Sequence, residues 1–175
     1  MNTGSHCKSP LLACLLFAVM AAVSPVSAQD GGSTTATGAA DPCAMLTEWE
    51  VSALAGVPML QMKRSEALTT EARVCMYMPK AASAAGVSGF TVSTYMSVGA
   101  PAVALKQFEA ECEPVMKFQR EPQFGPLSIS CVDAGAAQIT GFKGRSGLII
   151  QLSGKSPGLL AIARRGFAMA VKKLP

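Results

Sequence analysis

The sequence predicts a single α+β domain over residues 41–175, with a mainly antiparallel sheet, three helices packed on it and two disulfides. Two observations lead to this fold class. Segments with helical spacing of apolar residues alternate with groups of short strands, in the order helix, strands, helix, strands, helix. The roughly 150 residues that follow a predicted export signal also have the size of one domain, and no second linker divides them.

Residues 1–28 are typical of a secretory signal peptide. Lys8 precedes an apolar run over residues 11–23, which is followed by Pro25 and by small residues up to a cut after Ala28. As a helix, this run would extend only about 20 Å, which is too short for a hydrocarbon core of about 30 Å. We therefore expect a periplasmic or secreted bacterial protein without a membrane span.

A lipid anchor is the alternative processing of this N-terminus. Residues 11–14 read Leu-Leu-Ala-Cys and are similar to a bacterial lipobox, in which Cys14 would be lipidated. Because the apolar run continues well beyond Cys14, we favour a simple apolar role for this residue within the signal. Residues 29–40 have no large apolar side chain, so we expect them to form a flexible linker.

The first helix of the domain is predicted over residues 48–55. Thr47 stands three residues before Glu50, which is the spacing of a capping box. Gly56 supplies the left-handed conformation that commonly ends a helix. The helix is therefore expected to begin directly after Thr47 and to end directly before Gly56.

Six segments have the alternation or composition of strands. The alternation of apolar and polar residues is clearest from Phe90 onward, which indicates a half-buried strand. Pro79 ends the strand before it, and Lys143-Gly144 lies in a turn that indicates a hairpin near the C-terminus. The strands are expected at residues 59–66, 73–78, 90–98, 127–132, 137–142 and 148–152.

Two further helices complete the domain. Pro101 opens the second helix, where the missing N–H costs nothing, and Pro114 marks its end. Ser156 is the expected cap of the last helix, with Pro157 in the first turn. The apolar stripe of this last helix is expected to consist of Leu160, Ala163, Phe167, Ala170, Val171 and Leu174.

The composition argues against several classes of function. The formal net charge of +4 at pH 7 is small, and no basic cluster indicates a nucleic acid partner. The only histidine, His6, lies in the signal peptide. The mature chain would therefore lack the imidazole on which Ser-His-Asp and Cys-His catalysis, common zinc sites and histidine pH switches depend. We expect no cofactor.

Four cysteines remain after signal cleavage, and an even number in an exported chain indicates two disulfides. Three pairings are possible, and we prefer Cys43 with Cys75 and Cys112 with Cys131. Each bond would stabilise the fold by about 3 kcal/mol in the chain-entropy treatment. A site with four cysteine ligands is the alternative, but the sequence has no Cys-x-x-Cys pair to support it.

The start of the domain carries a recognisable pattern. Residues 41–47 read Asp-Pro-Cys-Ala-Met-Leu-Thr, Glu50-Val51 follow, and residues 75–77 read Cys-Met-Tyr. This resembles a family of small bacterial envelope proteins and lipoproteins of unknown function, with the pattern D-P-C-x-L-L-T-x-x-E-V and a later C-x-Y or C-x-W. The chain departs from the pattern at Met45. The resemblance implies an extracytoplasmic α+β domain in which the two motif cysteines pair, and it implies no catalytic residues.

Methionine is unusually frequent, and two spacings are typical of soft-metal proteins. Met59 and Met62 stand three residues apart, and Met76 and Met78 two apart. Thioether sulfur is a good ligand for Cu(I). We favour the interpretation that these methionines fill the core, but their exposure around one concave site would favour Cu(I) instead.

A small contact patch is the other candidate site. Ile162 and Met169 fall outside the apolar stripe of the last helix, and Arg165 and Lys173 flank them. Such a patch would suit a partner or an anionic surface. The alternatives are that a loop covers the two apolar residues or that they are isolated exposed residues.

The sequence as a whole favours an exported, disulfide-stabilised cell-envelope protein that is not an enzyme and that binds a small ligand or an envelope protein. A periplasmic Cu(I)-binding protein is the first alternative. A hydrolase that uses carboxylates alone is the second, but no local spacing singles out a catalytic pair. Glu109 and Glu113, for example, are four residues apart on the second predicted helix and are expected to lie on its solvated face.

Overall fold

The computed structural model describes residues 39–62, 65–69, 72–81, 86–112 and 116–175, all within one compact unit. The predicted signal peptide, Cys14 and most of the predicted linker lie outside the described residues. The last two linker residues are described, and they pack on the domain. Ala39 is buried, and the carbonyl of Ala40 accepts a hydrogen bond from Thr94 Oγ1. The linker prediction was based on the absence of large apolar side chains, but Ala39 and Ala40 pack on the domain although their side chains are small.

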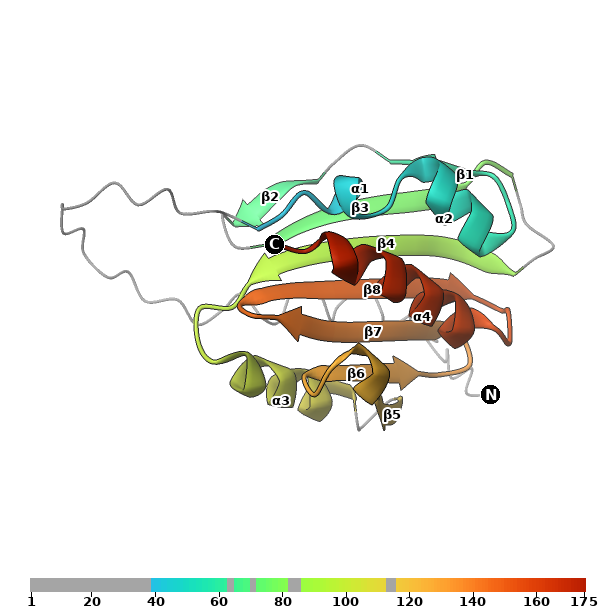
Figure 1. The fold of residues 1–175 in the computed structure, drawn as a ribbon. Coiled ribbons are helices and arrows are strands. Elements are labelled where there is room, and N and C mark those ends of the chain that lie inside the picture. The colour runs from blue at the N-terminus through green and yellow to red at the C-terminus, as the bar shows by residue number, and fades with distance from the viewer. Residues whose placement is uncertain (1–38, 63–64, 70–71, 82–85, 113–115) are drawn as a thin grey trace, which may run out of the picture. The chain divides into compact units, whose positions relative to one another are not determined.

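Within the described residues, eight antiparallel strands form one sheet, which confirms the α+β fold class (Figure 1). The strand order is β1-β3-β4-β8-β7-β6-β5, and β2 shares the outer edge of β3 with β1. The strands are β1 (Met59–Gln61), β2 (Ser65–Thr69), β3 (Ala72–Pro79), β4 (Val87–Met96), β5 (Lys117–Arg120), β6 (Ser128–Val132), β7 (Ala136–Lys143) and β8 (Ser146–Gly154). The helices are α1 (Pro42–Met45), α2 (Glu48–Ala55), α3 (Pro101–Cys112) and α4 (Leu159–Ala170), with 3₁₀ turns η3 (Pro122–Phe124) and η4 (Val171–Lys173).

Helices α1, α2 and α4 lie on one side of the sheet, which we call the three-helix face (Figure 1). Helix α4 packs over β7 and β8, α1 contacts β3 and β4, and α2 contacts α4 and β1. Because strand side chains alternate between faces, every second residue of the central strands enters this core. The core residues that the strands contribute are Met59, Cys75, Tyr77, Val87, Phe90, Val92, Ala137, Ile139, Leu148, Ile150 and Leu152.

Helix α3 lies on the opposite face, over β5, β6 and β7. Leu105 of α3 packs with Ile129 and Phe142, which point away from the main core. Gly147 leaves the space that this second cluster needs. It stands opposite Tyr95, and the Tyr95 ring covers it so closely that a Cβ atom at Gly147 would overlap the ring. The Tyr95 ring in turn packs edge-on against Phe142, with centroids 5.2 Å apart.

Each face of the sheet carries one disulfide. Cys43 of α1 is bonded to Cys75 of β3, with Cα atoms 5.2 Å apart. Cys112, the last residue of α3, is bonded to Cys131 of β6, with Cα atoms 6.0 Å apart. The preferred pairing from the sequence is therefore the pairing in the structure. The two bonds fix α1 and α3 to opposite faces.

The predicted capping box of α2 is also confirmed. Thr47 Oγ1 accepts a hydrogen bond from the N–H of Glu50, and the Glu50 carboxylate accepts one from the N–H of Thr47 at 2.7 Å. Gly56 ends the helix with φ of +71°, a conformation that a residue with a side chain adopts at a cost.

Several element boundaries differ from the prediction. The single strand expected at residues 59–66 is two strands, β1 and β2, and both α1 and β5 were missed. Helix α4 begins at Leu159 rather than at the predicted cap, Ser156, whose Oγ instead accepts a hydrogen bond from the N–H of Gly158 at 3.3 Å. In the described part of the chain, no helix is long and apolar enough to cross a membrane.

Candidate binding surface

The four methionines of the candidate Cu(I) site lie on two different faces of the sheet. Met59 is fully buried in the core of the three-helix face. Met62, Met76 and Met78 have 44%, 45% and 41% of their surface exposed. Residues an odd number of positions apart in a strand point to opposite faces, so Met59 and Met62 cannot serve one site on β1. The core-filler interpretation therefore holds for Met59 and is wrong for the other three.

Three methionines and one leucine form an exposed apolar cluster on β3, on β1 and at Met62, the residue directly after β1, and we call this cluster the methionine face. Leu60 is the register partner of Met78 across the two strands. Two residues along, the N–H of Met62 donates to the carbonyl of Met76 at 2.8 Å, so these two residues are also opposite one another. Directly opposed residues on antiparallel strands have Cβ atoms about 5 Å apart on one side of the sheet. The four side chains are therefore immediate neighbours.

Next to the methionine face, β3, β4, β7 and β8 point uncharged side chains to the same side of the sheet, and two of them, Ser93 and Thr140, are buried. Helices α1, α2 and α4 lie on the other side, and α3 covers the end formed by β5, β6 and β7 and reaches Tyr95 of β4 through Phe108. The strands between these regions point polar and aliphatic side chains to this side. By register with Met76, these are Val74, Thr91, Ser93, Ile149, Gln151, Gln138 and Thr140. No charged side chain belongs to this set.

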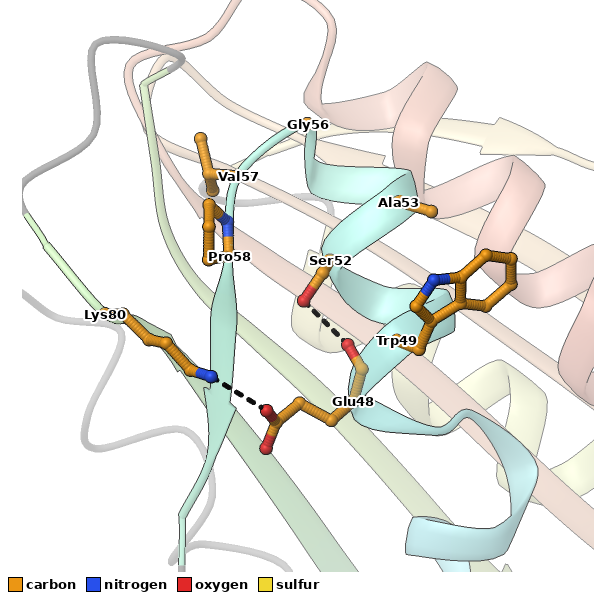
Figure 2. A pocket seen from close by; sticks show the side chains of 8 residues that line it. All are labelled: Glu48, Trp49, Ser52, Ala53, Gly56, Val57, Pro58 and Lys80. Carbon is orange, nitrogen blue, oxygen red and sulfur yellow. Dashed lines mark hydrogen bonds and ion pairs between the residues drawn. The ribbon is translucent and has the colours of Figure 1, made fainter.

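The outer edge of β1 beside the methionine face is closed by two side chains of α2 (Figure 2). The N–H of Met59 donates to Ser52 Oγ at 2.9 Å, and the N–H of Gln61 donates to Glu48 Oε2 at 3.0 Å. Lys80 Nζ pairs with the other carboxylate oxygen of Glu48 at 3.2 Å. The hydrogen bond from Gln61 and the interaction with Lys80 lower the pKa of Glu48. An edge strand whose N–H groups are occupied is a poor template for an added strand.

An open depression lies on the other side of this edge, along α2 and the turn that follows it. It has a volume of about 710 Å³ and is lined by Glu48, Trp49, Ser52, Ala53, Gly56, Val57, Pro58 and Lys80. Trp49 is 78% exposed and is the only tryptophan of the chain. In Figure 2 its ring points away from the ion pair of Glu48 and Lys80, so the aromatic and charged groups do not converge. Sequence reasoning did not single out Trp49, because the capping box accounted for its neighbours.

The contact patch predicted on the last helix is not an exposed apolar surface. Ile162 is only 9% exposed and belongs to the main core, and Met169 packs partly against that core. Lys173 Nζ pairs with Glu50 of α2 at 3.1 Å. Arg165 and Lys173 are both exposed, so only the two charged members of the predicted patch lie at the surface. All six residues of the predicted stripe lie in the core or pack against it, but the buried stripe is wider than predicted and also includes Leu159, Ile162 and Gly166.

At Gly166, a Cβ atom would lie 3.0 Å from the Phe90 ring. This close approach turns the Ile162 side of α4 toward the sheet. Glycine has no side chain to count in an apolar stripe, so the sequence pattern could not show that Gly166 faces the core.

Among the described residues, four glutamates have a lysine or arginine partner. Besides Glu48 and Glu50, Glu109 pairs with Arg120 at 2.5 Å. Glu121 is fully buried and lies against Arg164, with Nη2 of the arginine 2.7 Å from Oε1. These pairings link α3 to β5 and η3 to α4, so these carboxylates have structural roles.

Comparisons with protein-family models, with curated proteins and with solved structures found no match for this chain. The described residues also contain no group of three or more His, Cys, Asp or Glu side chains that could hold a metal ion.

Proposed function

We propose that this chain is an exported, non-catalytic binding protein of the bacterial cell envelope, and that its partner binds on the methionine face. One observation carries the proposal. Four large apolar side chains, Leu60, Met62, Met76 and Met78, are each more than 40% exposed and lie side by side on one side of the sheet. The two disulfides are compatible with an oxidising compartment such as the periplasm.

A contiguous exposed apolar cluster favours association, because covering it removes apolar surface from water. Each of the four side chains would contribute roughly 25 cal/mol for every square ångström that a partner buries. Methionine also suits this role because its unbranched chain and polarisable sulfur adapt to the shape of a partner. We therefore expect the partner to present apolar side chains.

The partner binds through its side chains rather than as an added strand. Ser52 and Glu48 occupy the N–H groups of Met59 and Gln61, which would otherwise be available at the outer edge of β1. A strand could pair there only after displacing both side chains. The methionine face, in contrast, presents side chains directly to solvent.

A hydrolase that uses carboxylates has less support from this geometry. Glu48, Glu50, Glu109 and Glu121 each pair with a lysine or arginine. A catalytic pair would need two carboxylates facing one another across the position of the substrate.

Site-specific photo-crosslinking tests the proposal. A photoreactive residue at position 60 or 78 is compared with one at Lys172, an exposed residue of η4. In cells that export the protein, we expect a defined adduct from positions 60 and 78 and none from position 172. With the crosslinker at position 60, Met78→Lys should abolish the adduct and Met78→Leu should retain it. Equal adducts from all three positions, or an adduct that survives Met78→Lys, would refute the proposal, and an adduct of twice the chain mass identifies a second copy as the partner.

A further inference from the structure

We propose that Met62, Met76 and Met78 together bind one Cu(I) ion through their thioether sulfurs. This inference rests on the proposed function, since it names a ligand for the same face. Met59 takes no part, because its side chain is buried on the other side of the sheet.

The backbone brings the three thioethers within reach of one ion. Met62 and Met76 are opposed across β1 and β3, with a backbone hydrogen bond of 2.8 Å between them. Met78 follows Met76 on the same strand and points to the same face, two residues or about 7 Å along. The diagonal from Met62 to Met78 spans about 7–8 Å between Cβ atoms. Three unbranched side chains, each with three rotatable bonds, can close this triangle above the sheet.

To join the other two thioethers, the Met78 side chain must turn from the β4 side of β3 toward β1. The sulfur of Met78 lies over Gly89 of β4, 3.8 Å from the position that a Cβ atom of Gly89 would occupy. Ser153 Oγ lies 2.8 Å from the same position, so Met78 would reach Met62 and Met76 by rotation about its own three side-chain bonds. Leu60 stands beside Met78 and gives the triangle an apolar flank.

The donor chemistry selects a soft monovalent ion. Thioethers are neutral, soft ligands that favour Cu(I) over hard or borderline divalent ions. Cys43, Cys75, Cys112 and Cys131 are held in disulfides and cannot compete as thiolates. The side chains that β4 and β8 place beside Met76 on this side of the sheet include no carboxylate that would favour a divalent cation.

A titration with Ag(I) tests the inference, because Ag(I) is a soft ion that needs no reductant able to open the disulfides. The exported protein is used, and intact mass establishes its N-terminus. If His6, Cys7 or Cys14 is retained, it is replaced by alanine or serine in every variant, since these side chains could bind the ion themselves. We expect one Ag(I) per chain and shifts of the methyl NMR signals of Met62, Met76 and Met78 only.

Conservative variants identify the ligands. Met62→Leu, Met76→Leu and Met78→Leu should each weaken Ag(I) binding at least tenfold, and the triple variant should abolish the site. Met59→Leu is the matched control and should leave the affinity unchanged. Leu60→Met places a fourth thioether beside Met78 and should tighten binding. Binding no tighter than that of an unfolded methionine peptide, or undiminished in the triple leucine variant, would overturn the inference.

The same variants separate this inference from the proposed function. The triple leucine variant keeps an apolar surface and should still form the crosslinked adduct while losing the ion. An adduct without Ag(I) binding in the parent protein refutes only the metal site. Stoichiometric Ag(I) binding without an adduct refutes only the proposed partner.

Discussion

The buried ion pair of Glu121 and Arg164 allows a sharp test of how this fold is held together. Glu121 precedes η3 and is fully buried, and Arg164 reaches it from α4. The guanidinium donates to both carboxylate oxygens, at 3.0 Å from Nε to Oε2 and 2.7 Å from Nη2 to Oε1. Ser130 Oγ donates to Oε1 at 2.6 Å, and Gln123 donates to Oε2. The perturbation is Arg164→Met, which keeps the apolar stem and removes the charge.

The loss of stability follows from what remains buried. Removing one partner of a buried pair costs about 3–5 kcal/mol, because the other charge is left without compensation. The Arg164 side chain is 33% exposed, so water can approach the carboxylate in the variant. We therefore expect the free energy of unfolding at pH 7 to fall by about 3 kcal/mol, the lower end of that range. Glu121→Gln leaves a partly exposed cation instead and should cost only about 1–2 kcal/mol.

The pH dependence gives a second, independent signature. Burial alone would raise the pKa of Glu121, but the hydrogen bonds from Arg164, Ser130 and Gln123 outweigh it and hold the pKa below its ordinary value. A lowered pKa contributes stability above the unfolded value of about 4.3, and this contribution is lost as pH falls through the folded pKa. In Arg164→Met, burial is opposed less, so Glu121 takes up its proton at a higher pH. The difference in free energy of unfolding between the parent and Arg164→Met should therefore become smaller as the pH is lowered from 7 to 3.

Urea unfolding followed by circular dichroism at pH 7 and pH 3, with both disulfides intact, measures this gap. Glu121→Gln is the matched control, because its difference from the parent should also shrink when Glu121 is protonated. Two results would refute the reasoning. One is a variant Arg164→Met that is no less stable than Glu121→Gln at pH 7, and the other is a gap that is equal at both pH values.

Three further predictions concern local structure. Cys43→Ser combined with Cys75→Ser should lower the free energy of unfolding by about 3 kcal/mol, and an unchanged Tm would contradict this. Thr47→Ala removes the cap of α2 and should cost about 1 kcal/mol in urea unfolding, whereas Thr47→Ser should cost much less. Gly147→Val places a side chain where the Tyr95 ring lies, and it should lower the free energy of unfolding by about 3 kcal/mol or more. We expect the near-UV circular dichroism of Tyr95 to change, and a native spectrum would contradict this prediction.

The elements that sequence reasoning placed best are those with local signals. Helix α2 has its cap, its capping box and its stop within ten residues, and both ends were correct. Helix α1 was missed although Asp41 caps it, because one turn of helix is too short to show a periodic pattern. Strand β5 was missed for a related reason, since its pairing with β6 depends on residues distant in sequence and its own four residues carry little alternation.

The candidate site could be predicted in composition but not in geometry. Strand alternation correctly placed Met76 and Met78 on one face, together with Val74. Which side of β3 is buried depends on where α1, α2 and α4 pack, and this is a matter of tertiary structure. The strand pattern, with methionines on one side and Cys75 and Tyr77 on the other, does not determine it. The apolar character of Met76 and Met78 suggested that they are buried, whereas Cys75 and Tyr77 are the residues of β3 that lie in the core.

The hydrogen bonds from α2 to the edge of β1 explain how this fold can expose an apolar face beside an edge strand. An apolar edge strand with free N–H groups would invite other chains to extend the sheet. Ser52 and Glu48 of α2 occupy the two outward N–H groups of β1, and Lys80 holds Glu48 in place. If a partner binds at this corner as proposed, it would do so through side chains, which discriminate by shape and chemistry, whereas backbone pairing accepts almost any extended segment. The blocked edge of β1 therefore allows the sheet to expose the methionine face without also exposing an unpaired strand to which other chains could add.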